Sequence, residues 1–196
     1  MALKTAPTDI GFAQITLSAM NAVAISESPF TYKQQIVQHT GQAWKASVTI
    51  PPVRRDLGEP WVAFLLSLQG PVNTFLLGDP NCTEPRGTAT DSSLTATGTA
   101  GASSVTITIS DGTTLKAGDY IQLGSVSTAR LHKVLADIST TGAVDIWPNL
   151  KATYSGAAVT VDNAKGVFRL VSNVQDWQIG NSSTYGISFE AVEVIT

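Results

Sequence analysis

Alternation of apolar and polar side chains constrains this sequence to a fold built mainly of β-strands. Residues 43–50 place Trp, Ala, Val and Ile among Lys, Ser and Thr at alternating positions. Residues 185–194 largely repeat the pattern, and a period of two puts the apolar side chains on one face of a half-buried strand. Shorter apolar or alternating segments predict further strands at 12–20, 22–26, 31–39, 72–77, 105–109, 120–123, 130–135, 143–147, 157–161, 167–170 and 174–179.

Glycine and proline predict where the first strands end. Thr40-Gly41-Gln42 lies between two predicted strands and has the composition of a hairpin turn. Pro51-Pro52 follows the strand at 43–50, and we expect it to end that strand because proline has no N–H to donate to a sheet. Pro29 is expected to separate two strand segments in the same way.

One segment, at about 59–69, has the spacing of an α-helix instead. Apolar side chains recur at the i, i+3, i+4 and i+7 positions from Trp61, which places them on one helical face. Pro60 suits the first helical position, where its missing N–H costs nothing. Gly70 can adopt the left-handed conformation that closes a helix, and Pro71 prevents its continuation. A helix this short is marginal alone, so we expect it to pack on the sheet.

A change in composition divides the chain. Its 196 residues fit one domain, or one domain with a smaller one inserted. Nearly every residue from 84 to 104 is Thr, Ser, Ala or Gly, which permits either a flexible linker or a mixture of loop and surface strand anchored by Leu94. We favour the mixture, because evenly spaced strands follow, as in a small antiparallel barrel or sandwich. We therefore predict a discontinuous domain of residues 1–83 and 166–196, with a β-domain inserted at 84–165.

No motif or cluster in the sequence predicts catalysis, a cofactor or a metal site. Cys82 is the single cysteine, and His39 and His132 each lack a second His or Cys at the spacing of metal ligands. Hydrogen bonding within turns explains the carboxylates at predicted turns, such as Asp79 and Asp119. A calcium site built from carboxylates in the loops of the inserted domain is the alternative.

The overall charge balance excludes some partners. The net charge is −3 and the isoelectric point is about 5.2, which argues against a general nucleic-acid-binding protein. Only 14% of the residues are charged, so the surface is polar but nearly neutral, as in many β-rich proteins that contact other proteins. No apolar segment has the length of a signal-peptide core or a membrane span, and we expect the chain to fold in a reducing cytoplasm.

Four residues are candidates for contacts between subunits. Arg54 and Arg55 follow the stiff Pro51-Pro52 pair and precede the predicted helix. They are either solvated charges beside nearby acidic residues or partners in an inter-subunit ion pair, since a guanidinium group can grip a carboxylate with two hydrogen bonds. Trp147 and Trp177 are expected to be partly exposed and to serve as interface anchors, because aromatic residues are enriched at protein interfaces.

Several stretches of the chain resemble the distal tail proteins of long-tailed bacteriophages and the related minor tail protein M of lambda-type tails. The stretches that carry the resemblance are 44–55, 59–70, 73–80 and 185–191, with looser matches at 115–123, 146–150 and 166–170. The shared features are the order of strand, helix and turn, without a catalytic signature. The resemblance covers residues 12–80 and 166–196, whereas the Ser- and Thr-rich insert departs from the family pattern.

The resemblance implies a fold and a function. The fold is mainly β, a tail-tube-like β-sandwich or split barrel with one short helix. The implied function is that of a virion structural protein, not an enzyme, that forms a hexameric ring at the distal end of the tail after assembly in the bacterial cytoplasm. Its implied partners are the tail tube protein, the tail tip or baseplate hub and, as a further candidate, the tape measure protein. The alternatives are another tail component, such as a tube or terminator protein, and a carbohydrate-binding or adhesin module.

Overall fold

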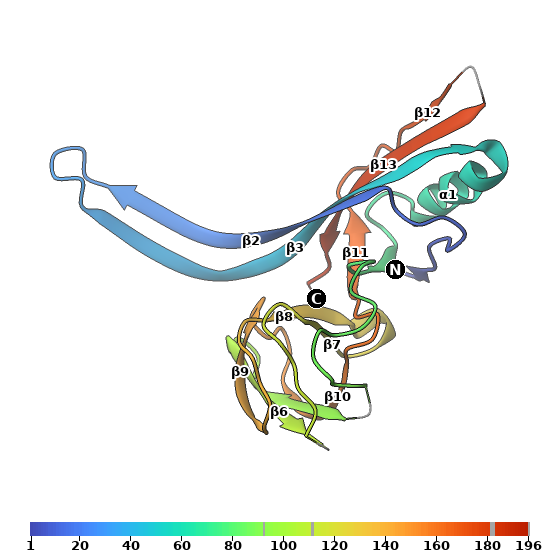
Figure 1. Cartoon of the computed structure of the whole chain (residues 1–196). Helices are drawn as coiled ribbons and strands as arrows, with labels where there is room; N and C mark the ends of the chain where they lie inside the picture. Colours follow the sequence, from blue (N-terminus) through green and yellow to red (C-terminus); the bar gives the residue numbers. More distant parts are fainter. Residues whose placement is uncertain (92, 111, 181–182, 196) are drawn as a thin grey trace.

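The protein is mainly β with one α-helix, as the sequence predicts. The structure, a computed structural model, describes residues 1–91, 93–110, 112–180 and 183–195. A curved sheet carries the helix at one end and continues at the other end into a long two-stranded ribbon (Figure 1). A closed barrel lies below the sheet, and the strands of the barrel all come from the middle of the chain.

The sheet joins strands from the beginning and the end of the chain. Its order is β1 (Leu3–Lys4), β4 (Thr74–Leu77), β11 (Gly166–Leu170), β13 (Thr184–Glu193), β3 (Gln34–Arg54) and β2 (Gln14–Glu27). A further strand, β12 (Trp177–Ile179), pairs with β13 near its beginning. The pairing of β1 with β4 is parallel and the other pairings are antiparallel. The strands β1 and β2 therefore lie at opposite edges of the sheet.

The helix α1 (Arg55–Leu68) covers one face of the sheet and starts four residues earlier than the sequence predicts. Pro60 consequently lies inside the helix and not at its first position. Contacts with β13 stabilise this additional first turn of the helix. Gly58 packs closely against Tyr185, and the Tyr185 hydroxyl donates a hydrogen bond to Glu59 Oε1 at 2.9 Å. At the other end Gln69 takes the left-handed conformation that was expected of Gly70, which is left-handed as well.

The barrel consists of six antiparallel strands in the order β10-β5-β6-β9-β8-β7. Their bounds are β5 Leu94–Gly98, β6 Ser104–Ile109, β7 Tyr120–Leu123, β8 Arg130–Val134, β9 Gly142–Trp147 and β10 Tyr154–Thr160. A single turn of 3₁₀ helix, η1 (Val126–Thr128), connects β7 to β8. Buried Val, Leu and Ile side chains fill the interior, among them Leu94, the predicted anchor of the Thr-rich segment. That segment is a loop followed by a barrel strand, the mixture that its composition favours.

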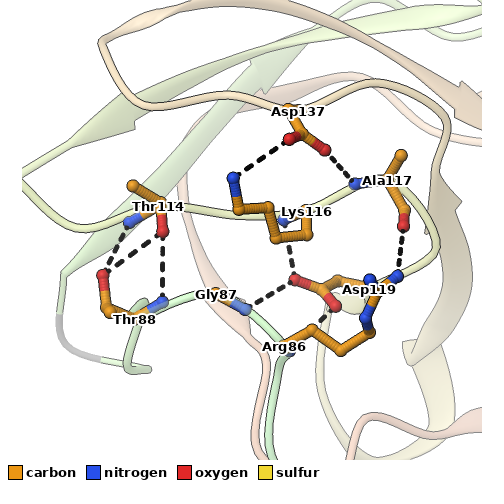
Figure 2. A network of polar contacts seen from close by, with 8 residues as sticks. All are labelled: Arg86, Gly87, Thr88, Thr114, Lys116, Ala117, Asp119 and Asp137. Carbon is orange, nitrogen blue, oxygen red and sulfur yellow. Dashed lines mark hydrogen bonds and ion pairs between the residues drawn. The ribbon is translucent and has the colours of Figure 1, made fainter.

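A buried carboxylate fixes the loop that leads into the barrel (Figure 2). Asp119 accepts hydrogen bonds from the backbone N–H groups of Arg86 at 2.9 Å, Gly87 at 3.3 Å and Lys116 at 2.8 Å. A side chain at Gly87 would overlap the backbone of Thr114, so only glycine permits this approach. Asp119 thus makes the turn hydrogen bond expected of it and also ties together two segments that are distant in sequence.

Two predictions about β3 are wrong, and both have a physical reason. Gly41 is not in a turn but within a continuous strand, where a Cβ would lie 3.0 Å from Ala22 beside an irregularity in the β2–β3 register. Pro51-Pro52 does not end the strand, because β3 pairs with β13 on both sides of the prolines and the register shifts between Tyr185 and Ile187. A bulge needs no ladder hydrogen bond from the proline nitrogens, so the strand can continue through them.

The true turn between β2 and β3 lies at residues 28–33. The N–H of Ser28 donates to the Lys33 carbonyl oxygen at 3.0 Å, and the N–H of Tyr32 donates to the Ser28 carbonyl oxygen at 2.8 Å. Tyr32 has a positive φ of 54°, which closes the turn. Pro29 therefore does separate two strands, as predicted, and the two strands form a hairpin much longer than expected.

Polar groups are buried where the barrel meets the sheet. Arg130 of β8 donates through Nη1 to the carbonyl oxygen of Val194. Glu193 of β13 is only 4% exposed, and its Oε2 accepts the backbone N–H of Trp44 at 3.1 Å. Desolvation raises the pKa of the Glu193 carboxyl group. The junction between barrel and sheet is therefore a packed and hydrogen-bonded contact.

His132 is fully buried in the same region. Its Nδ1 lies 2.7 Å from the carbonyl oxygen of Pro148, so the neutral ring donates its proton there. Burial lowers the pKa of His132 to about 4, because a charged imidazole would lose its hydration. The histidine is thus held neutral in the structural core.

Candidate subunit interface

A projecting hairpin is the most exposed apolar feature of the described chain. We call residues 22–41, the outer parts of β2 and β3 with the turn between them, the arm (Figure 1). Nearly every residue of the arm is exposed, and its hydrogen bonds are all internal. The six strand residues from Ala22 to Glu27 extend it by about 20 Å at roughly 3.3 Å per residue. The arm therefore presents both of its faces to solvent.

Apolar side chains are concentrated on the arm. Ile25 and Ile36 are direct cross-strand partners and are 64% and 62% exposed. At the tip, Phe30 is 92% exposed and Tyr32 is 76% exposed, while Val23 and Val37 add to the exposed apolar surface. Isolated exposed apolar residues are ordinary, but a continuous group of large ones marks an interaction surface.

The physical chemistry of a two-stranded ribbon supports the same interpretation. An isolated hairpin is at best marginally stable in water, because it lacks a third strand or a packed face. Among the residues that the structure describes, none gives the arm a third strand or a packed face. A partner that covers Ile25 and Ile36 would remove apolar surface from water and supply the packing that the ribbon lacks.

The root of the arm is anchored to the barrel. Trp147 donates from Nε1 to Asn21 Oδ1 at 2.9 Å, and its ring meets Trp44 edge to face at a centroid distance of 4.4 Å. The buried Gln42 accepts the backbone N–H of Asn149 through Oε1 at 2.7 Å. These contacts fix the orientation of the arm at its base. The described residues outside the arm make no hydrogen bond to its outer part.

The predicted interface residues do not form one patch. Arg54 and Arg55 are exposed where β3 leads into α1, and Trp177 lies on β12, on the other side of β13 from β3. Arg55 Nε forms an exposed ion pair with Glu59 at 3.3 Å, whereas no ion pair joins Arg54 to another described residue. Trp147 lies apart from these three, at the root of the arm. Their proposed role between subunits stays a prediction.

The two tryptophans are partly exposed, as the sequence predicts. Both are half-buried and pack against the hydrophobic core that contains Trp44 of the sheet and Trp61 of α1. Trp147 in particular uses its indole N–H within the chain. The arm is the feature that sequence reasoning missed, because alternation of side chains predicts a strand but not whether either face is covered.

The side chains that could bind a metal or take part in catalysis are widely separated in the part of the chain that the structure describes. Within the described ranges, no three His, Cys, Asp or Glu residues come together as they would around a metal ion. Cys82 is half-buried, and desolvation, followed by a hydrogen bond to Asp79 Oδ2 at 3.4 Å, raises the pKa of its thiol. The Asp79 Oδ1 atom accepts the N–H of Asn81 at 2.9 Å, the turn bond expected of this residue.

The comparisons with known proteins add no relative. No protein-family model matches the chain, and none of the curated proteins matches it either. Among the described residues, the single α-helix is too short and too polar to cross a bilayer.

Proposed function

We propose that this chain is a structural subunit of a bacteriophage tail. In this proposal, copies of the chain form a ring at the distal end of the tail tube and connect the tube to the tail tip or baseplate hub. The arm is the observation that carries the proposal, because its exposed apolar surface needs a protein partner. About 20 residues form the arm, close to the roughly 20–30 residues that each side contributes to a stable interface.

The arrangement of the sheet suits a ring. Subunits of a ring make a head-to-tail contact, in which two different surfaces of the same chain meet. The arm continues from β2 at one edge of the sheet, and β1 forms the opposite edge. A surface near β1 could therefore receive the arm of the preceding copy, and a closed cycle of such contacts would leave no arm uncovered.

The resemblance to distal tail proteins supplies the biological setting. It rests on the order of alternating strand, short helix and following strand, and this order is present as β3, α1 and β4. The hexameric order, the tail-tip location and the tube, hub and tape measure partners come from the resemblance alone. The low charge supports permanent contacts, since 14% charged residues leave few ions to desolvate when surfaces meet.

Gold-labelled antibodies against the chain test its location. Tailed particles purified from the source of the gene would be imaged by electron microscopy after labelling. We expect the label at one end of the tail, opposite the capsid. Label along the whole tail would favour the tube alternative, and particles without label or without the chain by mass spectrometry would overturn the proposal. Antibodies against an unrelated protein are the control.

A further inference from the structure

A groove lies beside the edge of the sheet opposite the arm. Its volume is about 490 Å³, and its walls are the N-terminal segment at 3–12, the end of β4 with the following turn, and the segment at 163–165 that leads into β11. Ile10 and Phe12 contribute apolar surface, and Pro80 lies on the facing wall. This volume is within the roughly 300–1,000 Å³ of sites that take organic ligands, so the groove can take aromatic side chains.

The groove is formed in the absence of a partner. The N–H of Ala2 donates to Asn73 Oδ1 at 2.8 Å, and the N–H of Ala13 donates to the Thr49 carbonyl oxygen at 2.9 Å, so the N-terminal wall is fixed at both ends. The Phe12 ring packs against Trp61 at a centroid distance of 5.8 Å. Rigid walls reduce the entropy lost when a ligand binds.

We propose that this groove receives the tip of the arm of a second copy of the chain. The inference rests on the proposed function, because it identifies the surface on which that ring contact would close. Phe30 and Tyr32 are the side chains that would enter the groove, since they are the most exposed aromatic residues at the tip. Their burial against Ile10 and Phe12 would cover both apolar surfaces at once.

Charge also favours a second copy as the occupant. The groove is lined by Lys4 and Lys165, neither of which forms an ion pair with another described residue. Glu27 is the one acidic residue of the arm and lies beside its tip. Lys33, the one lysine of the arm, has a counterpart in Asp79 of the groove. Complementary charges of this kind fix the register of a contact.

Photo-crosslinking tests which surface the arm tip contacts. Full-length chain carrying p-benzoyl-phenylalanine in place of Phe30 would be mixed with isotope-labelled wild-type chain and irradiated. We expect crosslinks between copies to peptides that contain residues 3–12, 76–80 or 163–165. The same photoreactive residue in place of Leu57, which is exposed on α1, is the matched control and should give few of these crosslinks.

The outcomes separate this inference from the proposed function. Assembled chain whose crosslinks reach other surfaces, or that gives none, would overturn the groove contact and leave the ring proposal standing. Chain that stays monomeric by native mass spectrometry would overturn both. Crosslinks to the groove in assembled chain would support both.

Charge reversal gives a second and independent test. The variant Glu27→Lys should raise the dissociation constant between subunits at least about tenfold, because like charges would meet across the contact. The double variant Lys4→Glu with Lys165→Glu should weaken assembly in the same way, and combining all three changes should restore it. Glu84→Lys makes the same charge change on an exposed residue outside both surfaces and should leave assembly unchanged. A combined variant that is no better than either parent would contradict the contact.

Discussion

The indole Nε1 of Trp44 donates a hydrogen bond to the carbonyl oxygen of Leu131 at 2.9 Å, and this bond joins the sheet to the barrel. Both residues are buried, and the Trp44 ring also contacts Tyr120 of the barrel. A side chain of the β3 strand thus binds the barrel, whose first strand begins only at Leu94. The barrel and sheet should therefore unfold as one unit.

Replacing Trp44 tests this junction. Trp44→Phe should lower the free energy of unfolding by about 1–3 kcal/mol, because the buried carbonyl of Leu131 loses this donor. Urea unfolding followed by circular dichroism measures the change. Trp177→Phe is the matched control, since Trp177 is half-buried away from the barrel and should lose less. Equal losses in the two variants would contradict a special role for the Trp44 hydrogen bond.

The buried His132 predicts a dependence of stability on pH. Its folded pKa of about 4 lies below the ordinary value of 6.5, so the unfolded chain binds a proton more readily between these values. Stability contributed by neutral His132 is complete above about pH 6.5 and is lost as the pH falls towards 4, by roughly 3 kcal/mol in all. Glu193 has a raised pKa and acts in the opposite direction.

A histidine variant isolates this effect from that of the carboxyl group. Unfolding of wild type and His132→Gln would be compared at pH 7 and at pH 4.5 in the same buffer. We expect the stability difference between the two proteins to shrink or reverse at the lower pH, because only wild type carries the histidine. A difference that is independent of pH would show that the imidazole does not titrate in this range.

The Asp119 network predicts a local effect at the entrance to the barrel. Asp119→Asn should weaken three hydrogen bonds to backbone N–H groups and lower stability by about 2 kcal/mol. Hydrogen exchange at the amides of Arg86 and Gly87 should become faster than at other loop amides. Asp137→Asn is the control, because Asp137 is exposed and its bonds to Lys116 and Ala117 should contribute less. Unchanged exchange at residue 87 would contradict the account.

The arginine pair at the start of α1 carries a prediction from the sequence. Arg54→Glu combined with Arg55→Glu should impair assembly while the monomer stays folded. The one ion pair lost, between Arg55 and Glu59, is exposed and contributes less than about 1 kcal/mol. Sedimentation would measure assembly and circular dichroism would measure folding. Normal assembly by the double variant would remove these residues from the interface.

The sequence predicts the strands of this protein better than their connections. Residues 120–123 form a strand with the expected bounds, and the alternation at 43–50 gives the buried face of β3 correctly. Local patterns suffice in both cases because one face of the strand is covered by a core. The turn at Gly41 and the strand end at Pro51-Pro52 are wrong because a bulge in the partner pairing decides whether such residues are tolerated.

The sequence predicts the candidate interface less well than it predicts the strands. Residue type alone points to Arg54, Arg55 and the two tryptophans, and residue type does not reveal that Trp147 uses its indole N–H within the chain. The arm depends on tertiary structure, because no described part of its own chain covers residues 22–41. Its apolar side chains, such as Ile25 and Ile36, have the same alternation as those of a buried strand.

Native mass spectrometry of the full chain tests the central claim most directly. At micromolar concentration we expect one closed oligomer, six copies if the resemblance holds, and a shift to monomer for Ile25→Ser combined with Ile36→Ser. Val174→Ser combined with Ile179→Ser removes exposed apolar side chains elsewhere and should leave the oligomer intact. Wild-type chain that remains monomeric at every concentration, or an arm variant that assembles normally, would contradict the account.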